Sequence, residues 1–167
     1  MDNNIKVNVT YASSKVIGID TEEDYIELKK ILNGRFSQSE STRLNYSRGE
    51  DTYDPILSKA VVFPETNEEV SKILKLCNEH KVPVVPFGTG TSLEGNVVGN
   101  DKGITISLEK MNKILTVNTQ DFDCRVQACV TREQLNDYLR EDGVFFPIDP
   151  GANAAIGGMA STSASGT

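Results

Sequence analysis

Hydrophobic residues recur along this chain with two different spacings, and each spacing predicts one kind of element. Apolar side chains three or four positions apart predict helices at about 21–33, 66–80 and 131–142. A threonine stands at the start of each predicted helix, where its hydroxyl can accept a backbone N–H. Glycines at positions 34 and 143 predict where the first and third helices end.

Short apolar runs between these helices predict strands. The runs lie at 60–63, 82–87, 104–108, 114–117 and 124–130, and an extended segment at 144–147 follows the third helix. Apolar and polar residues alternate at 104–108, which is typical of a strand. Residues 35–55 are polar and predict an irregular segment. The order of these elements predicts a mixed α/β or α+β fold built in layers.

A loop of glycines and hydroxyl residues, PFGTGTSLEGN, follows the strand at 82–87. A P-loop is excluded because no lysine follows Gly95, and a Rossmann loop is excluded because glycines 88, 90 and 95 have the wrong spacing. Two interpretations remain. The loop is either a nest of successive backbone N–H groups that binds an anion such as pyrophosphate, or a tight turn that binds nothing.

A second small-residue segment, GANAAIGGMASTSASGT, occupies 151–167. Its composition is that of a flexible linker, but apolar residues interrupt it at 156 and 159, and the rigid sequence FPIDPG leads into it. Small residues let the backbone approach a ligand closely. Together the two segments therefore predict two walls of one extended ligand site.

The motifs VVPFGTGTSLEGNVVG, ISLEKMNKIL, VTREQLNDYL and FFPIDPGANAAIGGMASTSASGT closely resemble the FAD-binding domain of vanillyl-alcohol-oxidase (PCMH-type) flavoproteins. Within that group the chain looks most like the FAD-linked D-lactate dehydrogenase and glycolate oxidase flavin-subunit branch. The resemblance implies an N-terminal helical extension at 1–45 and a PCMH-type domain at 46–167. The first subdomain of that domain would be nearly complete and the second truncated.

The resemblance also implies site residues and a reaction. FAD pyrophosphate would lie against Pro86, Phe87, Gly88, Thr89, Gly90, Thr91, Ser92, Gly95 and Asn96. The flavin side would be lined by Pro150, Gly151, Ile156, Gly157, Gly158, Ala160, Ser161 and Thr162. The parent enzyme would transfer a hydride from a D-2-hydroxy acid, of the D-lactate or glycolate type, to noncovalent FAD, because the loop has no histidine to tether it.

The resemblance places the catalytic groups beyond this chain, so no catalytic residue is named here and the 167 residues alone are expected to be inactive. Its alternatives are a flavoenzyme of other chemistry on the same fold and a non-catalytic binding module. One departure concerns Ala128 and Cys129, where the family usually has Pro-Gly in a turn.

Charge and cysteine content limit the classes of partner and the cellular compartment expected for this protein. A net charge of −7 without a basic cluster argues against nucleic acid, and no apolar run is long enough for a transmembrane segment. The three cysteines fit neither a disulfide framework nor a metal site, which predicts a cytoplasmic protein. The expected partners are a 2-hydroxy acid and an unknown electron acceptor. The simplest expectations for the charged residues are a turn at Asp149 and solvated surface for Arg43, Arg48 and His80.

Overall fold

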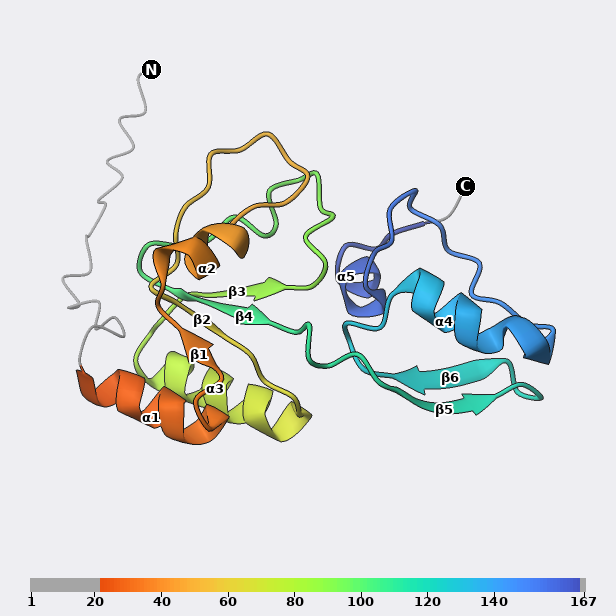
Figure 1. Cartoon of the computed structure of the whole chain (residues 1–167), viewed down its shortest axis with the longest axis horizontal. Helices are drawn as coiled ribbons and strands as arrows, with labels where there is room; N and C mark the ends of the chain where they lie inside the picture. The colour runs from red at the N-terminus through yellow and green to blue at the C-terminus, as the bar shows by residue number, and fades with distance from the viewer. Residues whose placement is uncertain (1–21, 166–167) are drawn as a thin grey trace, which may run out of the picture.

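The computed structural model describes residues 22–165, and the backbone forms two lobes joined by a linker (Figure 1). We call residues 22–107 the first lobe, 108–113 the linker and 114–165 the second lobe. The predicted cap Thr21 lies outside the described residues. Each lobe has its own hydrophobic core, and the two cores share no residue.

The first lobe contains a four-stranded sheet in the order β1-β2-β4-β3. The short strand β1 (Phe36–Ser37) pairs antiparallel with β2 (Ala60–Val62), whereas β4 (Ile104–Ser107) pairs parallel with both β2 and β3 (Val84–Phe87). The helices α1 (Glu22–Leu32) and α3 (Asn67–Glu79) lie together on one side of this sheet (Figure 1).

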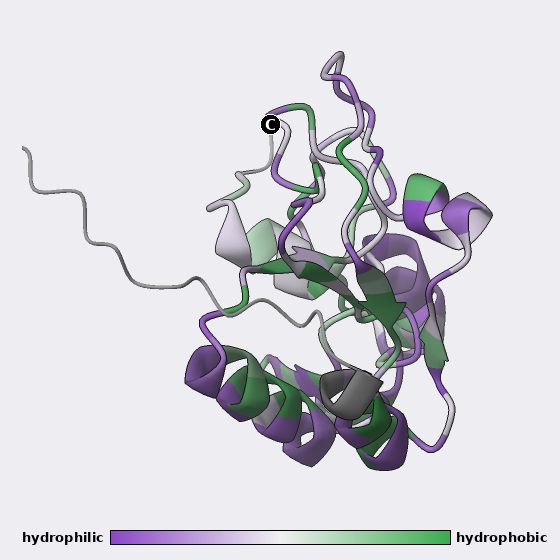
Figure 2. Cartoon of the chain, turned by 90° about the vertical axis from the view of Figure 1, so that its left-hand side faces the viewer, coloured by the Kyte–Doolittle hydropathy of each residue, from purple (hydrophilic) through white to green (hydrophobic). Residues whose placement is uncertain are grey.

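The core of the first lobe lies between these helices and the sheet. It includes Leu28 and Leu32 of α1, Ile73 of α3 and Ile104 of β4, all with no exposed surface. Figure 2 shows the apolar strands above the two helices, whose outer faces are polar. The boundary at residue 46 stays a prediction, although α1 and β1 pack on the same core as β2 and β4.

The segment at 35–55 is more regular than its sequence predicts. It contains β1 and the helix α2 (Glu40–Asn45), which Ser39 caps by accepting the Thr42 N–H at 3.3 Å. The helix has no buried residue, so hydrophobic spacing carried no sign of it. The expectation of an irregular segment is wrong here because local capping and strand pairing replace apolar periodicity.

The strand predicted from the alternation at 104–108 is confirmed as β4, and both faces of this strand are covered. Thr105 and Ser107 are as buried as their apolar neighbours. The Thr105 hydroxyl donates to the Ser58 hydroxyl at 2.8 Å, so its burial leaves no unpaired donor. Central parallel strands are covered on both faces, which explains why a polar residue here does not indicate solvent.

The second lobe contains the hairpin of β5 (Ile114–Asn118) and β6 (Asp123–Val126), with α4 (Arg132–Leu139) packed on it. The 3₁₀ turn η1 (Arg140–Asp142) extends α4 and ends at Gly143, whose φ is +71°. The last helix is α5 (Ile156–Ser161). The predicted mixed α/β class is confirmed, whereas residues 144–147 form no strand. Within the described residues no helix has the length and apolarity to cross a bilayer.

Candidate cofactor-binding site

The glycine loop leaves β3 at the carboxyl edge of the parallel strands and requires glycine at two positions. Gly90 has a φ of +74° and Gly95 a φ of +71°, which L-residues rarely adopt. A Cβ added at Gly90 would lie 2.9 Å from Cζ of Phe87. The positive φ and the close Phe87 ring therefore both disfavour a side chain at Gly90.

The loop presents a row of backbone donors. Within the described part of the chain, the N–H groups of Thr89, Gly90, Thr91 and Ser92 donate no hydrogen bond. The hydroxyls of Thr89 and Thr91, in the same loop, lie 3.4 Å apart. This geometry is compatible with a nest, because successive free N–H groups are what an anion requires.

A segment that we call the strap (residues 47–58) holds the loop from its other side. The Glu50 N–H donates to the Gly90 carbonyl at 3.1 Å. A Cβ at Gly95 would lie 2.8 Å from the Tyr53 ring, and one at Gly99 would lie 2.0 Å from the Ile56 carbonyl oxygen. Sequence reasoning missed the strap. The signal that could have indicated this close packing was the pair of glycines, Gly95 and Gly99, that face it.

The structure brings the two small-residue segments together, as the sequence predicts. A Cβ at Gly88 would lie 3.4 Å from Cβ of Ala155, the residue that precedes α5. The segment at Ala155 is fixed by backbone bonds, because the N–H groups of Ile156 and Gly157 donate to the carbonyls of Val130 and Ala128, each at 2.8 Å. The two segments come from different lobes and adjoin here, and their role as two walls of one ligand site stays a prediction.

The two glycines of α5 have different surroundings. A Cβ at Gly157 would lie 2.8 Å from both Cβ and the carbonyl oxygen of Ala128, so this glycine accommodates the protein's own turn. A Cβ at Gly158 would meet nothing within 4 Å. The hydroxyls of Ser161 and Thr162 donate back to the carbonyls of Gly157 and Gly158, at 2.8 and 3.0 Å.

A cavity of about 440 Å³ lies between the lobes on the α3 side of α5. Among the residues proposed from the resemblance, Ile156, Gly157 and Ala160 line it, and residues 86–96 do not. The remaining walls come from the start of α3, from Leu115 and from residues 125–128. The proposed site residues therefore fall on two surfaces, one facing the glycine loop and one facing this cavity.

The turn that leads to α5 is held by Asp149. Its Oδ1 accepts the Gly151 N–H at 2.9 Å, so the predicted turn at Asp149 is confirmed. Its Oδ2 pairs with Nη1 of Arg132 at 3.2 Å, which ties the turn to the start of α4. Pro150 and Gly151 remain exposed at the tip.

The charged residues named from sequence have separate outcomes. Arg43 is not fully solvated as expected, because its Nη1 donates to the carbonyl of Ser58, the last residue of the strap, at 3.3 Å. Arg48 is exposed, as predicted. His80 is half-buried at the C-terminal cap of α3. Ala128 and Cys129 do form the centre of a turn, closed by the Val130 N–H donating to the Gln127 carbonyl at 3.1 Å.

Tyr46 lies beside the loop and stays protonated over the physiological range. Two effects raise the pKa of the Tyr46 hydroxyl to about 12. The larger is burial, and the smaller is the hydrogen bond that the hydroxyl donates to Glu109. Its ring contacts Phe63 and Phe87 edge-to-face, with centroids 5.3 and 5.1 Å apart. Tyr46 therefore acts as a fixed donor that joins the first lobe to the linker residue Glu109.

These observations test whether a nucleotide cofactor fits the residues present. The free N–H row suits a phosphate anion, and the open space over Gly158 suits an extended ligand lying along α5. Gly88 and Ala155 approach one another closely, so the two predicted walls adjoin at this point. The donor set therefore fits a cofactor that carries phosphate groups.

The sequence model of the family described as FAD binding domain matches residues 58–167. A probable mitochondrial D-lactate dehydrogenase of Danio rerio is 45% identical over 131 residues, which are 78% of this chain and 26% of that protein. The mitochondrial D-lactate dehydrogenase [cytochrome] of Arabidopsis thaliana is 39% identical over 143 residues, 84% of this chain and 25% of that protein. Glycolate oxidase subunit GlcD of Bacillus subtilis is 32% identical over 141 residues, which are 83% of this chain and 30% of that protein.

Solved structures agree on the fold. An alkyldihydroxyacetonephosphate synthase superposes with a TM-score of 0.79 at 22% identity, over 95% of this chain and 31% of that chain. A p-cresol methylhydroxylase superposes with a TM-score of 0.62 at 23% identity, over 77% of this chain and 26% of that chain. The chain thus spans about a quarter to a third of the proteins it matches.

The comparisons correct one expectation. D-lactate dehydrogenases similar to this chain in Danio rerio, Arabidopsis thaliana and Saccharomyces cerevisiae are named mitochondrial, so the cytoplasmic assignment is wrong. Unpaired cysteines indicate that a compartment is reducing and do not identify which compartment it is. The match of the family's sequence model to residues 58–167 shows that the chain belongs to the FAD-binding domain family.

Proposed function

We propose that this chain is the FAD-binding portion of a flavin-dependent oxidoreductase that oxidises a D-2-hydroxy acid of the D-lactate or glycolate type. The observation that carries the proposal is the identity of 45% over 131 residues with a D-lactate dehydrogenase. The 32% identity with a glycolate oxidase subunit supports the same substrate class. Likeness to the solved structures supports the fold alone.

FAD, when bound, supplies a flavin ring that accepts the hydride from the α-carbon of the hydroxy acid. The backbone N–H groups of Thr89 to Ser92 would bind its pyrophosphate, with Gly90 keeping the anion's approach open. Each N–H bond to a charged oxygen is worth about 1.5–3 kcal/mol. Gly88, Ala155 and Gly158 would give the cofactor a wall without side chains. Binding is noncovalent in this proposal, since the loop has no histidine.

The test is made on the full-length enzyme that this proposal implies. The purified enzyme is expected to contain flavin, and D-lactate or glycolate should bleach the flavin absorbance under anaerobic conditions. L-lactate is the matched control and should leave the flavin oxidised. An enzyme that holds FAD but is reduced by neither acid would contradict the substrate class. An enzyme that binds no FAD would contradict the cofactor role as well.

A further inference from the structure

The relative position of the two lobes decides how wide the space between the two walls is. The glycine loop belongs to the first lobe and Ala155 to the second, and no core residue is common to both. Relative motion is the default expectation for lobes that lack a large hydrophobic interface. The contacts that cross from lobe to lobe therefore govern the geometry of the proposed FAD site.

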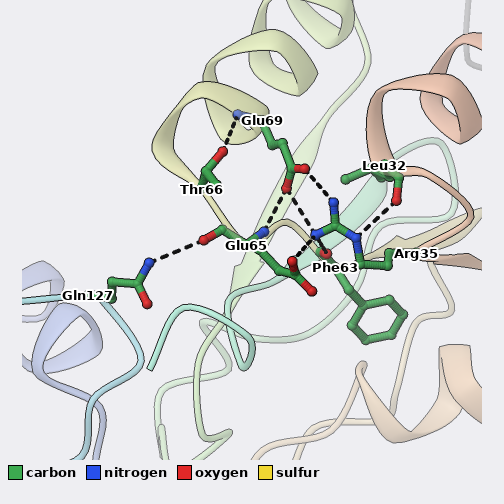
Figure 3. A network of polar contacts seen from close by, with 7 residues as sticks. All are labelled: Leu32, Arg35, Phe63, Glu65, Thr66, Glu69 and Gln127. Carbon is green, nitrogen blue, oxygen red and sulfur yellow. Dashed lines mark hydrogen bonds and ion pairs between the residues drawn. The ribbon is translucent and has the colours of Figure 1, made fainter. Parts of the chain in front are cut away.

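Gln127 makes such a crossing contact, and its side chain uses both of its polar atoms. Nε2 donates to the Glu65 carbonyl of the first lobe at 3.2 Å, as Figure 3 shows. Oε1 accepts the N–H of the linker residue Lys113 at 2.9 Å. The backbone N–H of Gln127 donates to the Lys113 carbonyl, also at 2.9 Å. One residue thus joins the second lobe, the linker and the first lobe.

The carbonyl that Gln127 reaches is itself held in place. The Glu65 N–H donates to Oε2 of Glu69 at 2.7 Å, and the Glu65 carboxylate pairs with Nη1 of Arg35 at 3.3 Å. Arg35 also binds Glu69, and its Nη1 donates to the Phe63 carbonyl at 3.3 Å (Figure 3). A contact made to a rigid carbonyl fixes the position of Gln127, whereas one made to a free loop would not.

We infer that Gln127 is a positioning residue that holds the two lobes at the separation the cofactor requires. The inference rests on the proposed function, because it takes the space between the glycine loop and α5 as the FAD site. Without the bond to Glu65, the lobes populate wider arrangements. The apparent FAD dissociation constant then rises, because it is inversely proportional to the fraction of molecules in the arrangement that can bind FAD.

Gln127→Glu tests the inference with little change of shape. A carboxylate retains the acceptor for the Lys113 N–H and loses the donor to the Glu65 carbonyl. Gln127→Ala removes both bonds without adding charge. Gln134→Ala is the matched control, because Nε2 of Gln134 donates to the Asn112 carbonyl at 2.9 Å and makes no bond to the first lobe.

The first measurement is the distance between the lobes in the 167-residue chain without FAD. Spin labels are placed on exposed Cys124 of the second lobe and on Lys72→Cys in α3. Cys77 and Cys129 are buried, and burial raises the pKa of both thiols, so they react slowly. Both Gln127 variants should broaden the distance distribution, and Gln134→Ala should leave it unchanged. An unchanged distribution in Gln127→Glu would overturn the inference.

The second measurement is FAD affinity in the full-length enzyme. We expect Gln127→Glu to raise the dissociation constant about tenfold, with activity restored at saturating FAD. A merely misfolded variant would not recover with added FAD. If the labels separate and FAD affinity stays at the wild-type value, the positioning role is wrong. If the wild-type enzyme fails to bind FAD, the proposed function has failed instead.

Discussion

Replacing Gly157 and Gly158 by alanine should change stability in opposite directions, although both glycines lie in α5. Helix propensity alone predicts that each substitution stabilises the helix by about 0.5–1 kcal/mol. At Gly158 the added methyl meets nothing within 4 Å, so we expect a gain of about 0.5 kcal/mol. At Gly157 the methyl would lie 2.8 Å from both Cβ and the carbonyl oxygen of Ala128.

The cost at Gly157 comes from the backbone, which cannot move like a flexible side chain. Relief of the clash would displace the turn at Ala128 and weaken the bond from the Gly157 N–H to the Ala128 carbonyl, now 2.8 Å. Overpacking of this kind costs about 1–3 kcal/mol. After the propensity gain, we expect Gly157→Ala to lose about 1–2 kcal/mol of unfolding free energy.

Urea unfolding of the chain, followed by far-ultraviolet circular dichroism, measures both variants. With a slope of about 2 kcal/mol per molar urea, the variants should differ by about 1 M in midpoint. Equal slopes are required, because a changed slope would signal a different unfolded or native state. If both variants are stabilised equally, the close approach of α5 to the Ala128 turn is refuted.

Three further predictions follow from the loop and the ion pairs. Gly90→Val should abolish flavin retention in the full-length enzyme. Gly143→Ala is the control and should retain flavin, because Gly143 also has a φ of +71° but a Cβ there would meet nothing within 4 Å. A yellow Gly90→Val enzyme would contradict the role of the loop. Acid precipitation of that enzyme should release all flavin into the supernatant, and flavin in the pellet would contradict noncovalent binding. The hydrogen bond to Arg35 lowers the pKa of Glu69, so Glu69 stabilises the fold above its unfolded pKa and the contribution disappears as pH falls through its folded pKa. Glu69→Gln should therefore flatten the acid side of the stability profile, and Glu68→Gln, at an exposed position, should not.

Elements marked by local chemistry could be predicted from the sequence. Thr66 and Thr131 accept N–H groups three residues ahead, and Gly143 ends its helix with a positive φ, as their positions indicate. These signals act within one turn of chain, so a single sequence contains them. The free N–H row of the glycine loop belongs to the same class, because it follows from a short run of small residues.

Elements that depend on distant partners could not be predicted. The strand β1 exists because Phe36 and Ser37 pair with β2, and nothing near residue 36 indicates that pairing. Helix α5 contains adjacent glycines, which are poor helix formers, and it is stabilised by bonds to Val130 and Ala128. Gln127 likewise has no sequence signature, since its role depends on where Glu65 lies.

The glycines of the proposed site show why a motif overstates the number of cofactor contacts. The resemblance assigned six glycines to the cofactor site: Gly88, Gly90, Gly95, Gly151, Gly157 and Gly158. The structure divides them: Gly95 accommodates the Tyr53 ring and Gly157 accommodates Ala128, so the close neighbour of each is the protein itself. Gly158, by contrast, borders open space. Cofactor affinity should therefore respond most directly at Gly158 and the loop N–H groups, whereas changes at Gly95 and Gly157 should act first through stability.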